Sequence, residues 1–363
     1  VRDYFHVSGW LTNPLDPKTT TTILFLTRWI THFCAPVFVF LSGASAWLQR
    51  VKGKETAVLS RHLFTRGLWL VVMELTVLSF GWSFSIPLFP NLQTIWAIGC
   101  SMIGLSALVW LPRRAVLGVG IAIVGLHNFT DSIHAAGLGK WGVLWTILHE
   151  GGPLVWHGTP MVWFFYPLLP WLAVMALGYG MGWIFLSPNR DRLAMTIGAV
   201  MIALFLVIRY TNAFGDPKPW MYVDGGRTWM KFLDVQKYPP SLLYVLMTLG
   251  PTLLLVPIYE RLRGVVADTL RTFGSVPFIA YVAHIYVLHA LVIVFNLATG
   301  KPVGIYFNTI YKSFFAPEQF RGLGYPLPVV YFAWALVIAL IYPLCRYWES
   351  VKKRKRTWWL SYL

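Results

Sequence analysis

Long uninterrupted apolar runs, separated by polar loops, dominate the chain. The runs do not alternate between apolar and polar residues, so they predict helices and not the strands of a barrel. Backbone groups in hydrocarbon need partners within their own segment, which a helix supplies. Nine runs are interpreted as spans, at about 29–49, 67–86, 94–111, 115–128, 161–186, 193–210, 241–258, 274–298 and 326–346. The pattern therefore predicts an all-α, polytopic membrane bundle.

Composition agrees with an integral membrane protein. Of the 363 residues, 57% are hydrophobic and 12% are charged, and the mean hydropathy is +0.60. These values exclude a soluble protein with a large core. The net charge of +16 is scattered over loops beside the spans and over the tail, so the positive-inside rule explains it and we expect no nucleic-acid partner. The three cysteines lie in or next to predicted spans and imply no disulfide framework.

The distribution of Lys and Arg predicts which side each loop occupies. More than half of these residues fall in loops on one side, namely 50–66, 112–114, 187–192, 259–273 and 346–363. The positive-inside rule places these loops, and a basic tail from about residue 347, in the cytoplasm. The opposite side receives the long aromatic loops, at 1–28, 128–160, 211–240 and 299–325. Loops of that length are typically functional, which predicts a site on the outer face of a multi-pass cell-membrane protein.

The chain begins at Val1 without a methionine and enters polar sequence at once. We expect an upstream segment that adds one more span, which would make ten. The sequence shows no strong repeat, and we interpret residues 1–363 as a single transmembrane domain. Oligomeric state is left open, and both a monomer and a homodimer fit the sequence.

Ionisable residues in or beside the spans are the candidates for chemistry, because such residues are costly in a membrane. His6 lies in RDYFHVSGW, just ahead of the first span. An imidazole titrates near neutrality and suits a general base, and Asp3 could orient it if this segment is helical. A surface histidine at an aromatic interface fits the same pattern.

Two pairs of polar residues at span ends are candidates for substrate binding. Arg28 and His32 lie one helical turn apart at the edge of the first span. Arg209 and Asn212 end the sixth span and could hold a substrate oxygen. In the alternative interpretation the arginines extend to the membrane surface and His32 bonds a backbone carbonyl.

The eighth span contains His284 and His289 in YVAHIYVLH. Residues five apart point about 140° away from each other on a helix, so a shared metal is not expected and only one of them should face the bundle interior.

A metal site is considered at His127, Asp131 and His134, which would share a face if the fourth span continued as a helix. The segment HNFTDSIHAAG has the composition of a helix end, so we expect no metal there. His149, Glu150 and His157 form a second polar cluster in the following loop. That cluster could line an outer site or belong to an ordinary interface loop.

Several motifs resemble one family of membrane enzymes. They are YFHVSGW, TRWITHFCAPVFVFLSGASAWL, RHLFTRGLWLVVMELTV, LQTIWAIGCSMI, YPLLPWLAVMALGYGMG and YPPSLLYVLMTLGP. Together they resemble the bacterial membrane proteins that carry a heparan-alpha-glucosaminide N-acetyltransferase catalytic-type domain. The resemblance covers nearly the whole chain and implies a transmembrane acyltransferase of the bacterial cytoplasmic membrane.

The resemblance implies roles for two histidines. His6 in YFH, followed by VFVFLSG, matches the position of the family's catalytic histidine. YVAH resembles the YxxH of the family's late helix, which favours His284 over His289. His6 would deprotonate the acceptor or carry the acyl group transiently, while Arg28, His32 and His284 would hold the thioester carbonyl and the acceptor.

The family resemblance implies the donor, the acceptor class and the direction of transfer. The donor would be cytosolic acetyl-CoA, and the acceptor a sugar amine or hydroxyl, such as that of a glucosamine-containing glycan, at the outer face. Membrane lipids would be the surrounding partners. The alternative is a non-enzymatic transporter or flippase for a glycan or lipid-linked substrate, built on the same polar interior.

Overall fold

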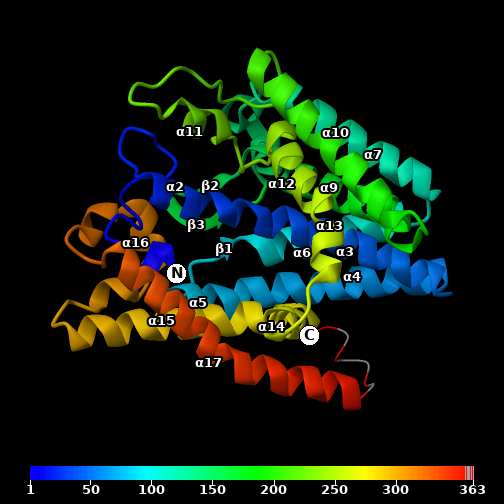
Figure 1. Cartoon of the computed structure of the whole chain (residues 1–363). Coiled ribbons are helices and arrows are strands. Elements are labelled where there is room, and N and C mark those ends of the chain that lie inside the picture. The colour runs from blue at the N-terminus through cyan, green and yellow to red at the C-terminus, as the bar shows by residue number, and fades with distance from the viewer. Residues whose placement is uncertain (356, 358–359, 361, 363) are drawn as a thin grey trace. The chain divides into compact units, whose positions relative to one another are not determined.

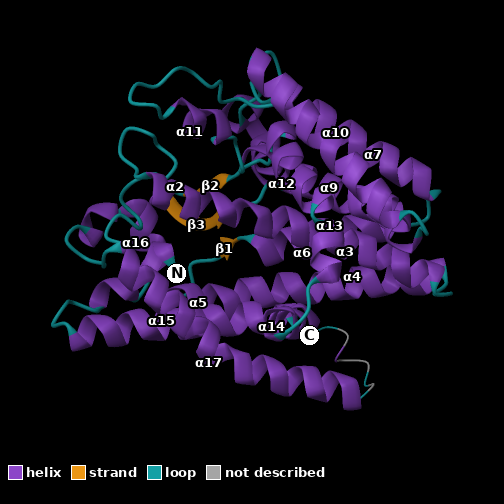
Figure 2. Ribbon diagram, viewed as in Figure 1, coloured by secondary structure: helices purple, strands orange, loops and turns teal. Residues whose placement is uncertain are grey.

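The computed structural model describes residues 1–355, 357, 360 and 362 and is mostly helical (Figures 1 and 2). The chain divides into two compact units. The terminal unit comprises Val1–Pro14, Leu75–Pro90 and Arg261–Leu363, and the central unit comprises Leu15–Glu74 and Asn91–Glu260. Arg356 and the tryptophans at 358–359 of the predicted basic tail lie outside the described residues.

The central unit contains most of the helices and the strands. Its elements are α2 (Thr22–Trp29), η1 (Ile30–Phe33), α3 (Cys34–Val51), α4 (Thr56–Met73), β1 (Asn91–Leu92), α6 (Thr94–Leu108), α7 (Arg113–Leu126), η3 (His127–Thr130), η4 (Ala135–Trp141), α8 (Gly142–Trp145), η5 (Thr146–Glu150), β2 (Gly152–Trp156), β3 (Thr159–Phe164), α9 (Leu168–Met181), η6 (Gly182–Leu186), α10 (Arg190–Thr211), α11 (Thr228–Leu233), α12 (Leu242–Leu254) and α13 (Val256–Arg261). Helix α9 packs against α3, α6 and α7, and α10 packs against α12.

The terminal unit is assembled from segments far apart in the sequence. Its elements are α1 (Arg2–Phe5), α5 (Ser79–Ser83), α14 (Val265–Ser275), α15 (Pro277–Ala298), η7 (Gly304–Tyr306), α16 (Thr309–Phe315), η8 (Pro317–Phe320) and α17 (Leu327–Arg354), and η2 (Glu74–Leu78) leads into it. Helix α15 packs against α5 and α17, and α1 contacts both α15 and α17. The N-terminal residues are therefore part of this unit's core, in which Phe5 is fully buried.

Seven helical segments of the described residues are long and apolar enough to cross a membrane: Thr22–Val51, Thr56–Ser83, Leu168–Leu186, Arg190–Thr211, Leu242–Arg261, Pro277–Ala298 and Leu327–Arg354. An eighth is counted if Arg113–Thr130 and Ala135–Glu150, which are bent by 114°, form one broken span. The structure confirms a multi-pass helical membrane protein with seven or eight long apolar helices. The predicted spans 94–111 and 115–128 correspond to the short helix α6 and to the first arm of this bent pair.

The predicted span 161–186 begins in the wrong place. Its first residues belong to β3, which pairs antiparallel with β2 and parallel with β1. The hairpin turns at His157 and Gly158, both at positive φ, which is the backbone of a two-residue type I′ turn. Helix α9 starts only after Pro167. The residues of β3 are as apolar as those of a span, so hydropathy alone did not separate them.

Helices α3 and α9 approach each other closely at two glycines. A Cβ on Gly178 would lie 1.9 Å from the Phe40 carbonyl oxygen, and one on Gly43 would lie 2.0 Å from the Met175 carbonyl oxygen. The spacing of Gly178 and Gly182 in the sequence is typical of close helix packing, and the structure confirms this interpretation.

Replacing Gly178 by alanine is expected to destabilise the protein by about 3 kcal/mol, because the added methyl group meets backbone and the helices must separate. Thermal unfolding in detergent measures the loss. Gly118→Ala in α7 is the matched control, since its Cβ would meet nothing within 4 Å and a helical alanine should keep or raise stability. Equal melting temperatures for the two variants would show that the close approach is not required.

Candidate active site

The backbone around His6 is fixed on both sides. His6 follows α1, and its N–H donates to the Arg2 carbonyl over 2.8 Å. The Tyr325 N–H donates to the Phe5 carbonyl (2.7 Å), and the Val7 N–H donates to the Tyr325 carbonyl (3.1 Å). His6 is therefore held in a short parallel bridge to the segment that precedes α17.

This bridge requires a glycine beside it. Gly324 has φ +93°, and a Cβ there would lie 2.8 Å from the carbonyl oxygen of His6. The Lys301 ammonium donates to the Gly324 carbonyl over 2.7 Å and lies 4.1 Å from the centre of the Tyr325 ring. These contacts anchor the strand partner of His6.

The ring of His6 has a defined tautomer. Its Nδ1 lies 2.7 Å from Ser8 Oγ and 3.2 Å from the Ser8 backbone nitrogen. A backbone N–H can only donate, so Nδ1 carries the lone pair and Nε2 carries the hydrogen in the neutral ring. Burial and the nearby Arg2 charge lower the pKa of His6, so the imidazole is neutral at pH 7. Nδ1 is thus a basic nitrogen held against a hydroxyl.

The side chain that contacts the His6 ring is Ser8 and not the predicted Asp3. The Asp3 carboxylate forms an ion pair with the Arg2 guanidinium. Ser8, two residues after His6, is the side chain at Nδ1. Sequence reasoning missed Ser8, and the only signal was a hydroxyl at the i+2 position of YFHVSG.

A small hollow lies beside His6. It is lined by residues that include Asp3, Tyr4, Trp10, Tyr306 and Phe320, and its volume is about 10 Å³. That volume accommodates about one water molecule. A single hydroxyl or amino group therefore fits against His6, and a whole sugar ring does not enter this hollow.

The fully buried histidine of α15 is His289. Its Nδ1 lies 2.9 Å from the Gly81 carbonyl oxygen and its Nε2 lies 2.8 Å from the Tyr306 carbonyl oxygen. His289 also lies against Tyr4, with ring centres 5.0 Å apart, which connects it to α1. His284 is half-buried and meets the edge of the Tyr281 ring. The sequence predicted that only one of the two histidines faces the interior. That residue is His289, whereas the family resemblance favoured His284.

Arg28 and His32 belong to the central unit. The Arg28 Nη1 donates to the Thr31 hydroxyl (3.0 Å), and the His32 Nδ1 donates to the Trp29 carbonyl (3.0 Å). His32 is 2% exposed, and its own carbonyl accepts the Tyr244 hydroxyl over 2.7 Å. Because Nδ1 donates to a carbonyl, the lone pair of the neutral His32 ring is on Nε2.

A lysine and two tyrosines lie in the same unit as this pair. The Lys237 ammonium lies 5.0 Å from the centre of the Tyr238 ring and 5.7 Å from that of Tyr166. Burial, the largest single effect, raises the pKa of Tyr238, but the charges of Lys237 and Arg28, together with hydrogen bonds from Lys237 and Tyr166, lower it overall. A phenol with a lowered pKa is a good hydrogen-bond donor to a developing oxyanion. Sequence analysis missed Lys237 and Tyr238, although Tyr238 begins the YPP motif.

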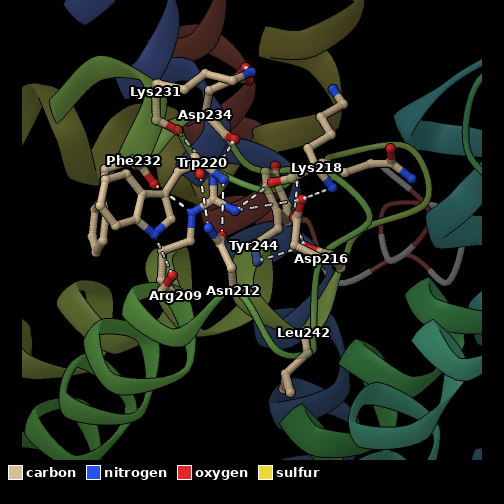
Figure 3. A network of polar contacts seen from close by, with 12 residues as sticks. Arg209, Asn212, Asp216, Lys218, Trp220, Lys231, Phe232, Asp234, Leu242 and Tyr244 are labelled. Atoms are coloured by element: carbon tan, nitrogen blue, oxygen red, sulfur yellow. Dashed lines mark hydrogen bonds and ion pairs between the residues drawn. The ribbon is translucent and has the colours of Figure 1, made fainter. Parts of the chain in front are cut away.

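The Arg209 guanidinium hydrogen-bonds to the backbone of the loop that follows α10 (Figure 3). Its guanidinium donates to four backbone carbonyls, those of Phe232 (2.9 Å), Lys218 (2.6 Å), Lys231 (3.0 Å) and Asp234 (2.9 Å). It is 1% exposed and lies 3.9 Å from the Asp216 carboxylate. Four of its five N–H groups are used in these hydrogen bonds, and the Asp216 carboxylate lies beside the guanidinium, so Arg209 anchors the loop between α10 and α12 and does not fit the predicted substrate-binding role.

Asn212 has a structural role of the same kind. It ends α10 in the left-handed conformation, at φ +52°. Its side-chain amide donates to the Trp220 carbonyl (2.8 Å) and its side-chain oxygen accepts the Trp220 N–H (3.0 Å). Both polar atoms of Asn212 contact this backbone, which gives the residue a structural role, and its substrate-binding role stays a prediction.

The family model for heparan-alpha-glucosaminide N-acetyltransferase, catalytic, matches residues 4–214, which is more than half of the chain. The chain belongs to this family. Comparison with curated proteins and with solved structures gives no match. Membership makes the protein a multi-pass membrane acyltransferase of the heparan-alpha-glucosaminide N-acetyltransferase family. The matched segment begins at Tyr4 and contains His6, Ser8, Arg28 and His32, whereas Lys237 and His284 lie beyond it.

Proposed function

We propose that the protein transfers an acetyl group from acetyl-CoA on the cytoplasmic side to an amino or hydroxyl group of a sugar on the outer side. Family membership supports an acetyltransferase that acts on an amino sugar. The observation that carries the proposal is the Nδ1 lone pair of His6, held 2.7 Å from Ser8 Oγ beside a hollow of the size of one hydroxyl or amino group.

His6 acts as the general base. As the acceptor oxygen or nitrogen attacks the thioester carbonyl, its proton passes through the Ser8 hydroxyl to His6 Nδ1, and a tetrahedral intermediate forms. The carbon–sulfur bond then breaks, and the CoA thiolate takes the proton from His6. Because Nδ1 is engaged by Ser8 and Nε2 carries the hydrogen, this geometry supports a base more than a transient acyl-histidine.

Within the central unit, Arg28 and His32 keep the donor-binding role proposed from the sequence, and we add the Tyr238 phenol. His284, in the terminal unit, likewise keeps the role proposed from the sequence. The charges of Arg28 and Lys237, which lower the pKa of Tyr238, would also favour an anionic ligand.

Acetyl-CoA is expected to raise the melting temperature of the full-length protein in detergent, whereas ATP should not. A ligand at 100 times its dissociation constant stabilises the folded state by about 2.7 kcal/mol. With radiolabelled acetyl-CoA and a glucosamine-containing acceptor, the label should move to the sugar. A transporter would leave the label on CoA, and no stabilisation by either acetyl-CoA or CoA, with the protein folded, would contradict the proposal.

A further inference from the structure

Three side chains that bind metals well meet at the bend between the two arms Arg113–Thr130 and Ala135–Glu150. They are His127, Asp131 and His149, and their ligand atoms all lie within 4.8 Å of one another. His127 comes from the first arm, Asp131 from the bend and His149 from the second arm. The grouping differs from the one considered in the sequence. His134 turns away, is 69% exposed and pairs with Glu150 at 3.1 Å, and His149 takes its place.

The spacing of the two imidazoles suits one ion between them. His127 Nδ1 lies 3.2 Å from His149 Nε2. Two nitrogens that bind one tetrahedral Zn²⁺ at about 2.0 Å are separated by about 3.3 Å. The Asp131 carboxylate oxygen lies 3.7 Å from His149 Nε2, near enough to complete the set with a small movement of its side chain.

The cluster contains more lone pairs than hydrogens. His149 Nε2 faces three acceptor atoms, which are the carbonyl oxygen of His127, the Thr130 hydroxyl oxygen at 3.1 Å and the Asp131 carboxylate, and it also lies beside His127 Nδ1. Thr130 uses its own hydrogen on the His127 carbonyl, at 2.6 Å. One imidazole N–H cannot satisfy three acceptors. A metal cation can, because it accepts several lone pairs at once.

The surroundings hold the cluster in place. The second oxygen of Asp131 accepts the Asn128 amide (2.8 Å), and the Asn128 oxygen accepts the backbone N–H of Leu242 at the start of α12 (2.9 Å). The Trp145 ring stacks on His149 at 4.8 Å. Such contacts behind the ligands orient metal-binding side chains in known sites.

We infer that His127, Asp131 and His149 bind a divalent transition-metal ion of the Zn²⁺ type. Two imidazoles and one carboxylate suit such ions and not Ca²⁺ or Mg²⁺, which prefer oxygen ligands. Thr130 or water would take the remaining coordination position. Because the ligands come from both arms, the bound ion would link the two arms of the bent pair. This site is independent of the proposed acetyl transfer.

The test is the metal content of full-length protein purified in detergent through a tag without histidine. Elemental analysis should find about one zinc per chain, and Zn²⁺ added to chelator-treated protein should raise its melting temperature. Asp131→Asn, at a half-buried position, should lower the zinc content at least tenfold, and His127→Ala should do the same where it folds. His134→Ala is the matched control and should keep the metal.

Two results would overturn the inference. One is wild-type protein that contains less than a tenth of a zinc per chain and whose melting temperature is unchanged by added Zn²⁺. The other is equal zinc content in wild type and Asp131→Asn, which would mean that the ion binds elsewhere. Since the titration of wild-type protein needs no variant, a misfolded His127→Ala does not prevent a decision.

Discussion

The rate of acetyl transfer by His6→Ala is expected to fall by about 10²- to 10⁴-fold, which is the usual contribution of a general base. The amount of folded protein should be unchanged. The His6 N–H donates to the Arg2 carbonyl, and the neighbouring Phe5 and Val7 bond to the Tyr325 backbone, so the loss of the His6 ring should not unfold the terminal unit. The measurement is transfer of radiolabelled acetyl to a sugar acceptor, with folded protein quantified in parallel. Full activity in His6→Ala would remove this residue from the mechanism.

Variants of Ser8 and Asp3 test which of these two side chains orients the His6 ring. Ser8→Ala removes the hydroxyl at Nδ1 and should lower the rate more than Asp3→Asn does, because Asp3 is paired with Arg2. Ser8→Thr keeps a hydroxyl and should restore part of the rate. A larger loss in Asp3→Asn would return Asp3 to the orienting role predicted from the sequence.

The pH dependence of transfer follows from the same ring. Burial and the Arg2 charge lower the pKa of His6 below its ordinary value of 6.5. The base is active when neutral, so the rate should be on a plateau at pH 7 and fall as the pH drops through this lowered pKa. A rate that rises on acidification would instead identify His6 as an acid.

Hydropathy predicted the positions of the seven long apolar helices among the described residues, because a membrane span needs both length and apolar residues, but the structure does not show the nine spans predicted. It did not predict the hairpin of β2 and β3, whose apolar residues precede α9 without a polar break. It also did not predict the bend after α7. The polar segment that ends α7 turns back into a second helical arm, which depends on contacts such as the bond between Asn128 and Leu242.

The site was less predictable than the fold. His6 was proposed from a motif and stays a prediction, but its partner Ser8 was not predicted because a serine two residues from a histidine has no characteristic pattern. His289 was placed second to His284, although the carbonyls of Gly81 and Tyr306 hold it in the core. These partners come from distant segments of the chain, which no local spacing in the sequence reveals.

The partners of Arg209 also could not be predicted from local sequence spacing, and we expect its replacement to lower the stability of the protein. Arg209→Met is expected to destabilise the folded protein by about 3–5 kcal/mol, because it removes the cation beside the buried Asp216 carboxylate and leaves four backbone carbonyls without their donor. Thermal unfolding and the yield of monodisperse protein in detergent measure this loss. Arg209→Lys keeps the charge but cannot reproduce the planar fork that reaches four carbonyls, so it should be intermediate.

The two roles of Arg209 give opposite results in these variants. An anchor of the loop lowers the melting temperature with and without acetyl-CoA, and the stabilisation by acetyl-CoA stays the same in the fraction that folds. A substrate-binding arginine would leave the melting temperature of the free protein unchanged and weaken binding of the donor or acceptor. Since the contacts of Arg209 are all with its own unit, we expect the first result. A wild-type melting temperature in Arg209→Met would restore the role predicted from the sequence.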